Sequence, residues 1–330
     1  MAKMRRLGKS ELKVSEIGLG CWAIGGPSFD DNGEPTGWSG NNDADSLAGL
    51  YRAYELGVNH WDTADVYGKG HSERLIGRVF REGVKREEIV LASKVGWHKG
   101  TAAHSFESLN IRNQLEQSLK NLNTDYLDIY YLHNPFFGEK DQYLNPAAET
   151  MHQLKEEGKI RVVGQSAYSY KQFLRVCQTT KPEVLQLPYN ALRSPFDALR
   201  SDIFSWSDEN DMGVVMFGSY AKGILLGKYD ENNLPQVEDG DVRARSGEFE
   251  SDFLRRLKPA LNQLRDRFGS HLGDLARVAN QYALSKSEAA VVIPGFKNER
   301  QVTVNTATMD KPLTIEEIRF VESVFESFKN

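Results

Sequence analysis

The segment HWDTADVYG (residues 60–68) decides the fold, because a short strand-like run in it ends abruptly in a polar turn. It belongs to a series of eight short runs rich in Val, Ile and Leu, each of which ends in polar or turn-forming residues. The runs cover residues 16–23, 58–63, 89–95, 126–132, 160–166, 184–188, 213–217 and 289–293. Their length and composition predict eight buried strands.

Stretches with helical periodicity separate these runs. The clearest of them are residues 43–56, 72–81, 105–121, 146–157, 253–268 and 272–285. Strand and helix in strict alternation predict parallel pairing, with helices that cover the sheet. Eight such units in one chain favour a closed (β/α)8 TIM barrel, of the α/β class, over an open doubly wound sheet.

Four segments depart from this repeat. Residues 5–14 predict a β-hairpin that plugs the N-terminal end of the barrel, and residues 314–328 predict an extra C-terminal helix with a Thr–Glu capping box. The stretches 25–42 and 226–251 are far longer than usual βα loops, which suggests that they shape a pocket or close over a ligand. No composition break marks a linker, so we expect one domain over residues 1–330.

Composition excludes several classes of function. The 330 residues are 40% apolar and 26% charged, which supports a sizeable core. A net charge of −5 gives no basic field for nucleic acid or an anionic membrane. We see neither a secretion signal nor a membrane span, and only two cysteines, so we expect a cytoplasmic protein. The sequence carries no signal for an oligomeric state.

Four proton-handling side chains end or follow the predicted strands: Asp62, Tyr67, Lys94 and His133. For Tyr67 to act as a general acid near neutral pH, its pKa must fall from about 10, which requires about 4 kcal/mol in favour of the phenolate. An ammonium about 4 Å away at an effective dielectric near 20 supplies that much, and Lys94 is the candidate. Asp62 would keep Lys94 charged, and a neutral His133 would orient a carbonyl oxygen.

Each of these residues alone has a simpler explanation. An Asp–Lys pair is most often a buried ion pair between strands, and a lone Tyr or His is most often a half-buried side chain. Their occurrence together, in order and at strand ends, favours the catalytic interpretation. No histidine spacing suits a metal, which argues against a metal-dependent barrel hydrolase.

Motifs along nearly the whole chain resemble those of the aldo-keto reductases. They are GLGCW (18–22), DTADVYGKGHSE (62–73), ASK (92–94), DIYYLH (128–133), GQS (164–166), LQLPYN (185–190), KGILLGKY (222–229) and IPGFKNERQVTVN (293–305). The resemblance implies that the four residues form a catalytic tetrad and that the cofactor is NADP(H), bound without a GxGxxG loop. It also implies a small carbonyl or sugar substrate, reduced by hydride from the nicotinamide and a proton from Tyr67.

The same resemblance implies a set of cofactor contacts. They are Trp22, Asp62, Ser166, Gln186, Phe217, Gly218, Ser219, Tyr220, Lys222, Gly295, Lys297, Gln301 and Asn305. Ser166 and Gln186 match the nicotinamide carboxamide pair, and Phe217 matches the stacking aromatic, commonly Tyr. The segment from Gly295 to Asn305 matches the site for the 2′-phosphate and adenine, and Arg243 and Arg245 are further candidates for the phosphate. The residue after Ser166 is usually Asn, and here it is Ala167.

Aromatic residues after strand ends predict the substrate pocket. They are Trp22, Trp97, Phe136 and Phe137, and Phe29 and Trp38 in the first long loop are further candidates. One alternative function stays open at this point. An NADPH-binding sensor or regulatory subunit of the same family would keep the barrel and the cofactor site but turn over little substrate.

Overall fold

Eight parallel strands form the central sheet of the computed structural model, which describes residues 2–30, 32–193, 196 and 202–328. The strands are β3 (Leu19–Gly20), β4 (His60–Asp62), β5 (Val90–Val95), β6 (Leu127–Leu132), β7 (Ile160–Ser166), β8 (Val184–Pro188), β9 (Gly213–Phe217) and β10 (Ala290–Val292). They lie side by side in chain order. All eight predicted strands are confirmed, but the first is shorter than predicted because its end turns into a 3-10 helix, η1 (Ala23–Gly25).

The sheet closes on itself between its first and last strands. The backbone N–H of Gly18 donates to the Val292 carbonyl over 2.7 Å, and the N–H of Val292 donates to the Glu16 carbonyl over 3.0 Å. A further parallel bridge joins Gly20 to Gly295. These bonds confirm the predicted (β/α)8 barrel, which has no free strand edge at this point.

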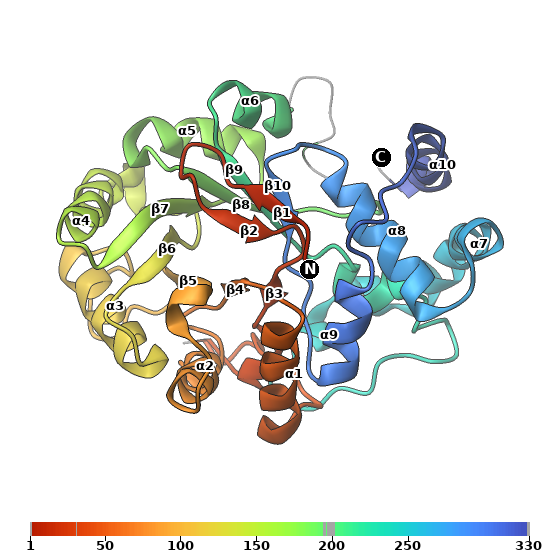
Figure 1. Cartoon of the computed structure of the whole chain (residues 1–330), viewed down its shortest axis with the longest axis horizontal. Helices are drawn as coiled ribbons and strands as arrows, with labels where there is room; N and C mark the ends of the chain where they lie inside the picture. The colour runs from red at the N-terminus through yellow and green to blue at the C-terminus, as the bar shows by residue number, and fades with distance from the viewer. Residues whose placement is uncertain (1, 31, 194–195, 197–201, 329–330) are drawn as a thin grey trace.

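The N-terminal hairpin consists of β1 (Met4–Arg6) and β2 (Lys13–Ser15), which pair antiparallel. Figure 1 shows it lying across one end of the barrel. Its Leu7 and Val14 side chains are fully buried and join a cluster with inward-facing strand residues such as Val215. The predicted hairpin is confirmed, and its apolar side chains fill the end of the barrel interior.

Ten α-helices occur in the described residues, and most of them surround the strands (Figure 1). They are α1 (Asp43–Glu55), α2 (His71–Arg81), α3 (Ser108–Leu122), α4 (Leu144–Glu156), α5 (Tyr170–Thr180), α6 (Ile203–Glu209), α7 (Ser251–Phe268), α8 (Leu272–Leu284), α9 (Glu299–Thr306) and α10 (Ile315–Phe325). The predicted capping box at the start of α10 is present. Within the described part of the chain, no helix has the length and apolarity needed to cross a membrane.

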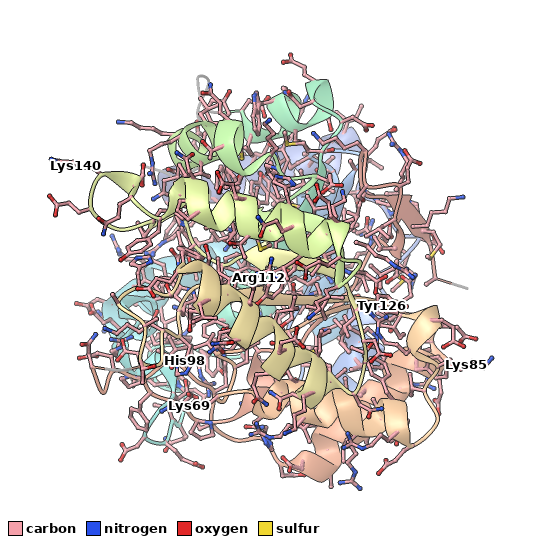
Figure 2. All side chains as sticks on the ribbon, turned by 90° about the vertical axis from the view of Figure 1, so that its left-hand side faces the viewer. Lys69, Lys85, His98, Arg112, Tyr126 and Lys140 are labelled. Atoms are coloured by element: carbon pink, nitrogen blue, oxygen red, sulfur yellow. The ribbon has the colours of Figure 1, made fainter. Side chains whose placement is uncertain are left out.

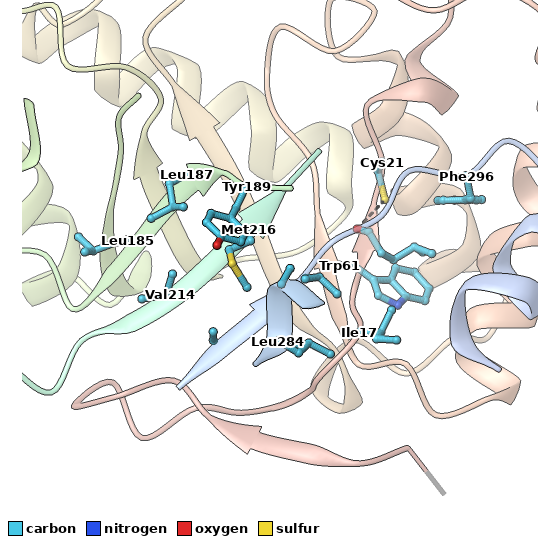
Figure 3. Close-up of a cluster of buried hydrophobic side chains, with 14 of the residues drawn as sticks. Ile17, Cys21, Trp61, Leu185, Leu187, Tyr189, Val214, Met216, Leu284 and Phe296 are labelled. Atoms are coloured by element: carbon cyan, nitrogen blue, oxygen red, sulfur yellow. Dashed lines mark hydrogen bonds between the residues drawn. The ribbon is translucent and has the colours of Figure 1, made fainter. Parts of the chain in front are cut away.

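Side chains alternate between the two faces of the barrel wall. On β8 and β9, Leu185 and Met216 point outward into the layer under the helices, which Figure 3 shows, whereas Val184 and Val215 point into the barrel. Because side chains on a strand alternate between its two faces, the polar residues at alternate positions near the strand ends face the inside of the barrel. One inner position must be a glycine, because a Cβ on Gly164 would lie 2.2 Å from the Tyr131 ring.

Candidate active site

The C-terminal ends of the strands open onto a cavity of about 1260 Å³. In Figure 2 the loops after β4, β5 and β6, marked by Lys69, His98 and Lys140, lie on one side of the molecule. The loops that precede β5 and β6, marked by Lys85 and Tyr126, lie on the opposite side. In a (β/α)8 barrel the C-terminal side is where active sites form. Three of the four predicted tetrad residues line this cavity, namely Asp62, Tyr67 and His133.

Lys94 lies directly behind the cavity wall, fully buried on β5. Its ammonium group donates to Asp62 Oδ1 over 2.5 Å, to the Thr63 carbonyl over 2.7 Å and to the Tyr67 hydroxyl over 3.1 Å. All three donor positions of the ammonium are therefore used, as a buried charge requires. The side chains of Asp62, Tyr67 and Lys94 form one connected group.

Tyr67 lies in the turn that follows β4. The turn packs so closely against η1 that a Cβ on Gly68 would lie 2.0 Å from the Gly25 carbonyl oxygen, and Gly68 has a φ of +59°. The turn therefore requires a glycine next to the tyrosine. The Tyr67 ring stacks on Trp22 with 5.9 Å between ring centroids, which fixes the direction of its hydroxyl.

The acidity of Tyr67 differs from the prediction. Burial raises the pKa of the Tyr67 phenol well above its ordinary value of 10, and the Asp62 carboxylate adds to the rise. The sequence predicted a lowered pKa because Asp62 was considered only as the group that keeps Lys94 charged, and neither burial nor the effect of Asp62 on the phenol was counted. Asp62 lies 2.5 Å from the ammonium and offsets its charge, so the phenol keeps its proton at neutral pH.

His133 follows β6 and faces the same group. Its backbone N–H continues the ladder by donating to the Val95 carbonyl over 2.8 Å, and its ring meets the Tyr67 ring edge-on at 5.8 Å. Burial lowers the pKa of His133 well below 6.5, and the nearby Lys94 charge lowers it further. The imidazole is therefore neutral at pH 7, as predicted, and suited to donate a hydrogen bond to a carbonyl oxygen.

The predicted nicotinamide contacts surround the tetrad group. Ser166, Gln186 and Phe217 all line the cavity. The Gln186 amide nitrogen donates to Asp62 Oδ2 over 2.7 Å, so its orientation is fixed by the tetrad itself. This leaves the Gln186 carbonyl oxygen as the group that can accept a hydrogen bond from a carboxamide.

The loop after β9 supplies the next stretch of the cavity wall. Gly218, Ser219, Tyr220 and Lys222 all line the cavity. The Lys222 ammonium donates to Ser246 Oγ over 2.9 Å and lies 3.3 Å from a Glu248 carboxylate oxygen. Its charge is thus partly offset by the second long loop.

Cations gather at the far end of the cavity. Lys297 lines it together with Gly295, Gln301 and Asn305, and the Lys297 ammonium reaches the Ser39 carbonyl of the first long loop. Burial and, after it, the Arg243 charge lower the pKa of Lys297 to about 8. Lys228 also has a lowered pKa, through burial and then through Arg300 and Arg243.

Such crowding of like charges destabilises the protonated forms unless an anion is present. Two backbone N–H groups near the start of α9 already have hydrogen-bond partners. The Lys297 N–H donates to Gln301 Oε1 over 2.9 Å, and the Gln301 N–H donates to Asn298 Oδ1 over 3.0 Å. The attraction for an anion at this end therefore comes chiefly from the side chains.

The two long loops are joined to each other beside this end of the cavity. Asp241 is fully buried and accepts hydrogen bonds from the Ser39 backbone and hydroxyl and from the Arg243 guanidinium. The Arg243 guanidinium also lies 4.9 Å from the Trp38 ring centroid. The Arg243 charge is therefore offset by Asp241, and Arg245 pairs with Glu34 at the surface. Both arginines are thus engaged in contacts that join the two long loops.

The structure brings together only some of the residues predicted for the substrate pocket. Trp22 and Trp97 line the main cavity, but Phe137 does not, because it is 0% exposed and stacks on Phe106 in the core at 4.5 Å. Phe136 is 51% exposed and lies with Trp97 on a smaller neighbouring pocket of about 340 Å³. Phe136 and Phe137 are adjacent in the chain but point in different directions, and the sequence did not show which of them would be buried.

Several residues of the cavity wall escaped the sequence-based search. Lys228 lines the cavity within the KGILLGKY segment, where its lysine could have been noted beside Lys222. Tyr168 lines it beside Ser166 and lies two residues after β7, which the strand-end rule could have identified. Phe29 and Trp38, suggested as further candidates, both line it.

Comparisons with known proteins agree with this geometry. The model described as "Aldo/keto reductase family" matches residues 16–326. An aldo-keto reductase of Schizosaccharomyces pombe, whose name specifies NADP(+), is 27% identical over 319 residues, which cover 93% of this chain and 88% of the relative. The NADH-specific methylglyoxal reductase of Escherichia coli is 25% identical over 343 residues, with 98% of each chain covered.

A solved structure shares the fold. The holo form of an aldo-keto reductase from Bacillus halodurans superposes with a TM-score of 0.75 at 27% identity, and the match covers 98% of this chain and 96% of that chain.

Proposed function

Because the chain belongs to the aldo/keto reductase family, we propose that it is an NADP(H)-dependent oxidoreductase that reduces the carbonyl group of a small aldehyde, ketone or sugar to an alcohol. The observation that carries this proposal is the hydrogen bond of 3.1 Å between Lys94 and the Tyr67 hydroxyl at the cavity wall. It joins a proton donor to a buried cation–carboxylate pair at the place where a substrate oxygen can reach it.

The residues fit a dinucleotide at both ends of the cavity. Gln186, already oriented by Asp62, presents a free acceptor beside the tetrad, and Phe217 presents an aromatic face. At the other end, burial and then the Arg243 charge lower the pKa of Lys297 to about 8. A 2′-phosphate there would stabilise the charged form of Lys297, which supports NADP(H) over NAD(H).

Tyr67 would act as the general acid in spite of its raised pKa. Bound NADPH would supply the hydride to the carbonyl carbon. The carbonyl oxygen would then become an alkoxide, a strong base whose basicity resembles that of hydroxide. Proton transfer from the Tyr67 hydroxyl to such an oxygen would be favourable, because a phenol is ordinarily a far stronger acid than an alcohol.

Lys94 and His133 would assist this transfer in different ways. The Lys94 ammonium already donates to the Tyr67 oxygen, so it stabilises the phenolate that the transfer leaves behind. The neutral His133 ring, edge-on to Tyr67, would donate to the carbonyl oxygen and hold it near the hydroxyl. Trp22, stacked on Tyr67, would exclude water from this side.

The test is a substrate screen with NADPH and NADH side by side. Aldehydes, ketones and sugar aldehydes should each be offered, with loss of reduced nicotinamide as the readout. The proposal requires substrate-dependent oxidation of NADPH at a higher kcat/KM for the cofactor than NADH gives. Tight NADPH binding without turnover of any class would instead support a sensor.

A further inference from the structure

Asn280 lies on α8 behind the cavity wall, with a side chain that is 0% exposed. Both the oxygen and the nitrogen of its carboxamide form hydrogen bonds. Ser219 Oγ donates to Asn280 Oδ1 over 2.9 Å, and Asn280 Nδ2 donates to the Tyr220 hydroxyl over 2.8 Å and to Thr308 Oγ1 over 3.3 Å. Asn280 is not itself part of the cavity lining.

The bonds continue from Tyr220 to α9 and the loop after β10, which also line the cavity. The Tyr220 hydroxyl donates to Asn305 Oδ1 over 3.0 Å, and Asn305 Nδ2 donates to the Gly295 carbonyl over 3.2 Å. Ser219, Tyr220 and Asn305 are all buried and all line the cavity. One buried amide thus connects the loop after β9 with α9 and the loop after β10.

We propose that Asn280 is a positioning residue, which fixes the spacing between the loop after β9 and α9 and so holds the adenosine-phosphate half of the cofactor cleft in its binding shape. This inference rests on the proposed function, since it concerns the site for NADP(H). It adds a residue that does not touch the cofactor cleft and that no motif in the sequence indicates.

The chemistry of the network requires an amide at this position. Asn280 must accept from Ser219 and donate to Tyr220, and only a group with both an acceptor and a donor can do this. Because Tyr220 accepts from Asn280, its own proton is directed to Asn305. A carboxylate at position 280 would instead attract the Tyr220 proton and release Asn305.

The effect should be confined to one half of the cleft. The tetrad is held by a separate group of bonds, which runs from Lys94 through Asp62 to Gln186. Neither of these bonds involves Asn280, so disturbance of the network should weaken cofactor binding more than it slows proton transfer. A merely structural residue would lower stability without this selectivity.

The experiment compares Asn280→Asp with Asn59→Asp. Asn59 also uses both sides of its amide, accepting from the Ser15 N–H over 2.7 Å and donating to the Lys13 carbonyl over 3.0 Å at the hairpin end of the barrel. NADPH affinity is measured by quenching of protein fluorescence, and kcat by substrate turnover at saturating NADPH. Hydrogen exchange of the cofactor-free protein reports on residues 217–226 and on α9 directly.

For Asn280→Asp we expect the Kd for NADPH to rise about tenfold, which corresponds to the loss of about 1.4 kcal/mol, while kcat stays within about twofold. Hydrogen exchange should accelerate in residues 217–226 and in α9. Asn59→Asp should leave the Kd and both segments unchanged. A Tyr220→Phe variant should weaken binding in a way that does not add to Asn280→Asp, since both break the same chain of bonds.

An unchanged Kd in Asn280→Asp, an equal loss in both variants, or a fall in kcat at unchanged Kd would each overturn the proposal. If the unmodified protein itself does not bind NADPH, the proposed function fails, and the exchange data then decide about Asn280 alone. Unchanged exchange in residues 217–226 and α9 would show that Asn280 does not hold these segments.

Discussion

The Lys94 ammonium donates a hydrogen bond to the Tyr67 hydroxyl over 3.1 Å from inside the barrel wall. The same nitrogen is 2.5 Å from Asp62, so the cation beside the phenol is largely neutralised. This arrangement keeps the proton on the resting Tyr67 side chain, and it also places a hydrogen-bond donor where a phenolate would need one. It therefore suits the proposed transfer of a proton to an alkoxide rather than acidity at rest.

Replacement of Tyr67 by Phe removes the proposed proton donor and keeps the ring that stacks on Trp22. General acid catalysis contributes about 10² to 10⁴ in rate, so kcat should fall by about that factor while NADPH binding survives. Steady-state turnover and fluorescence titration check the two parts. The control is Tyr54→Phe. Tyr54 lies on α1, and its hydroxyl donates a hydrogen bond to the Glu88 carboxylate. A rate for Tyr67→Phe equal to that of the control would remove Tyr67 from the mechanism.

Replacement of Lys297 by Gln removes a cation that we assign to the 2′-phosphate. The Kd for NADPH should rise about tenfold or more, and the Kd for NADH should change little, because only NADPH carries that phosphate. Titrations with both nucleotides give the ratio. Lys258→Gln, which alters a lysine paired with Glu231 away from the cavity, should not change it. Equal losses with both nucleotides would contradict the assignment.

The affinity for NADPH should also depend on pH through Lys297. Its pKa of about 8 means that the ammonium loses its proton at mildly alkaline pH, whereas a bound phosphate favours the charged form. NADPH binding should therefore be strongest below about pH 8 and weaken as the pH rises above that value, and this dependence should be absent in Lys297→Gln. Titration of the Kd against pH in both proteins checks this. A flat profile in the unmodified protein would show that Lys297 does not face the phosphate.

The buried carboxyl group of Asp65 should make the stability of the folded protein depend on pH. Burial raises the pKa of its carboxyl well above 3.8, and Glu73 raises it further. In the unfolded chain the group ionises near its ordinary pKa, so stability is highest at acid pH and falls as pH rises toward the raised pKa. Asp65→Asn cannot ionise, and its Tm should exceed that of the parent by a few degrees at pH 8 and by less at pH 5.

Thermal unfolding at the two pH values measures this difference. Asp252→Asn, which alters an exposed carboxylate on α7, should give the same Tm as the parent at both. A Tm difference for Asp65→Asn that is independent of pH would show that Asp65 is ionised in the folded protein.

The adjacent residues Phe136 and Phe137 should behave in opposite ways. Phe137 is buried against Phe106, so Phe137→Ala should lower the free energy of unfolding by about 3 to 5 kcal/mol. Phe136 is exposed beside Trp97, so Phe136→Ala should leave stability within about 0.5 kcal/mol and alter the KM for some carbonyl substrates. Denaturant unfolding and substrate kinetics separate the two. A stable Phe137→Ala protein with a changed KM would restore its predicted role in the pocket.

The sequence predicted the barrel because its signals are local. The runs at 184–188 and 213–217 coincide with β8 and β9 as observed, since period-two burial and strand length are written within each segment. Hydrogen bonds between Gly18 and Val292, which close the barrel, link residues far apart in the chain. Closure of the barrel could be predicted only from the presence of eight strand–helix units, because neither segment alone indicates that it pairs with the other.

Residue type and position at a strand end were enough to predict that Asp62 and Lys94 lie together. Effects that depend on a third group were not predicted. The rise in the Tyr67 pKa depends on how closely Asp62 offsets Lys94, and the engagement of Arg243 depends on its contact with Asp241. Asn280 has no signal of its own, because one buried amide on a helix looks like any other until its partners are known.

Carbonyl-dependent oxidation of NADPH, with the alcohol product quantified beside the consumed cofactor, tests the central claim most directly. The account predicts that NADPH loss requires a carbonyl substrate, that alcohol forms in equal amount, and that both stop together in Tyr67→Phe. Tight binding of NADPH with no alcohol from any aldehyde, ketone or sugar offered would contradict it.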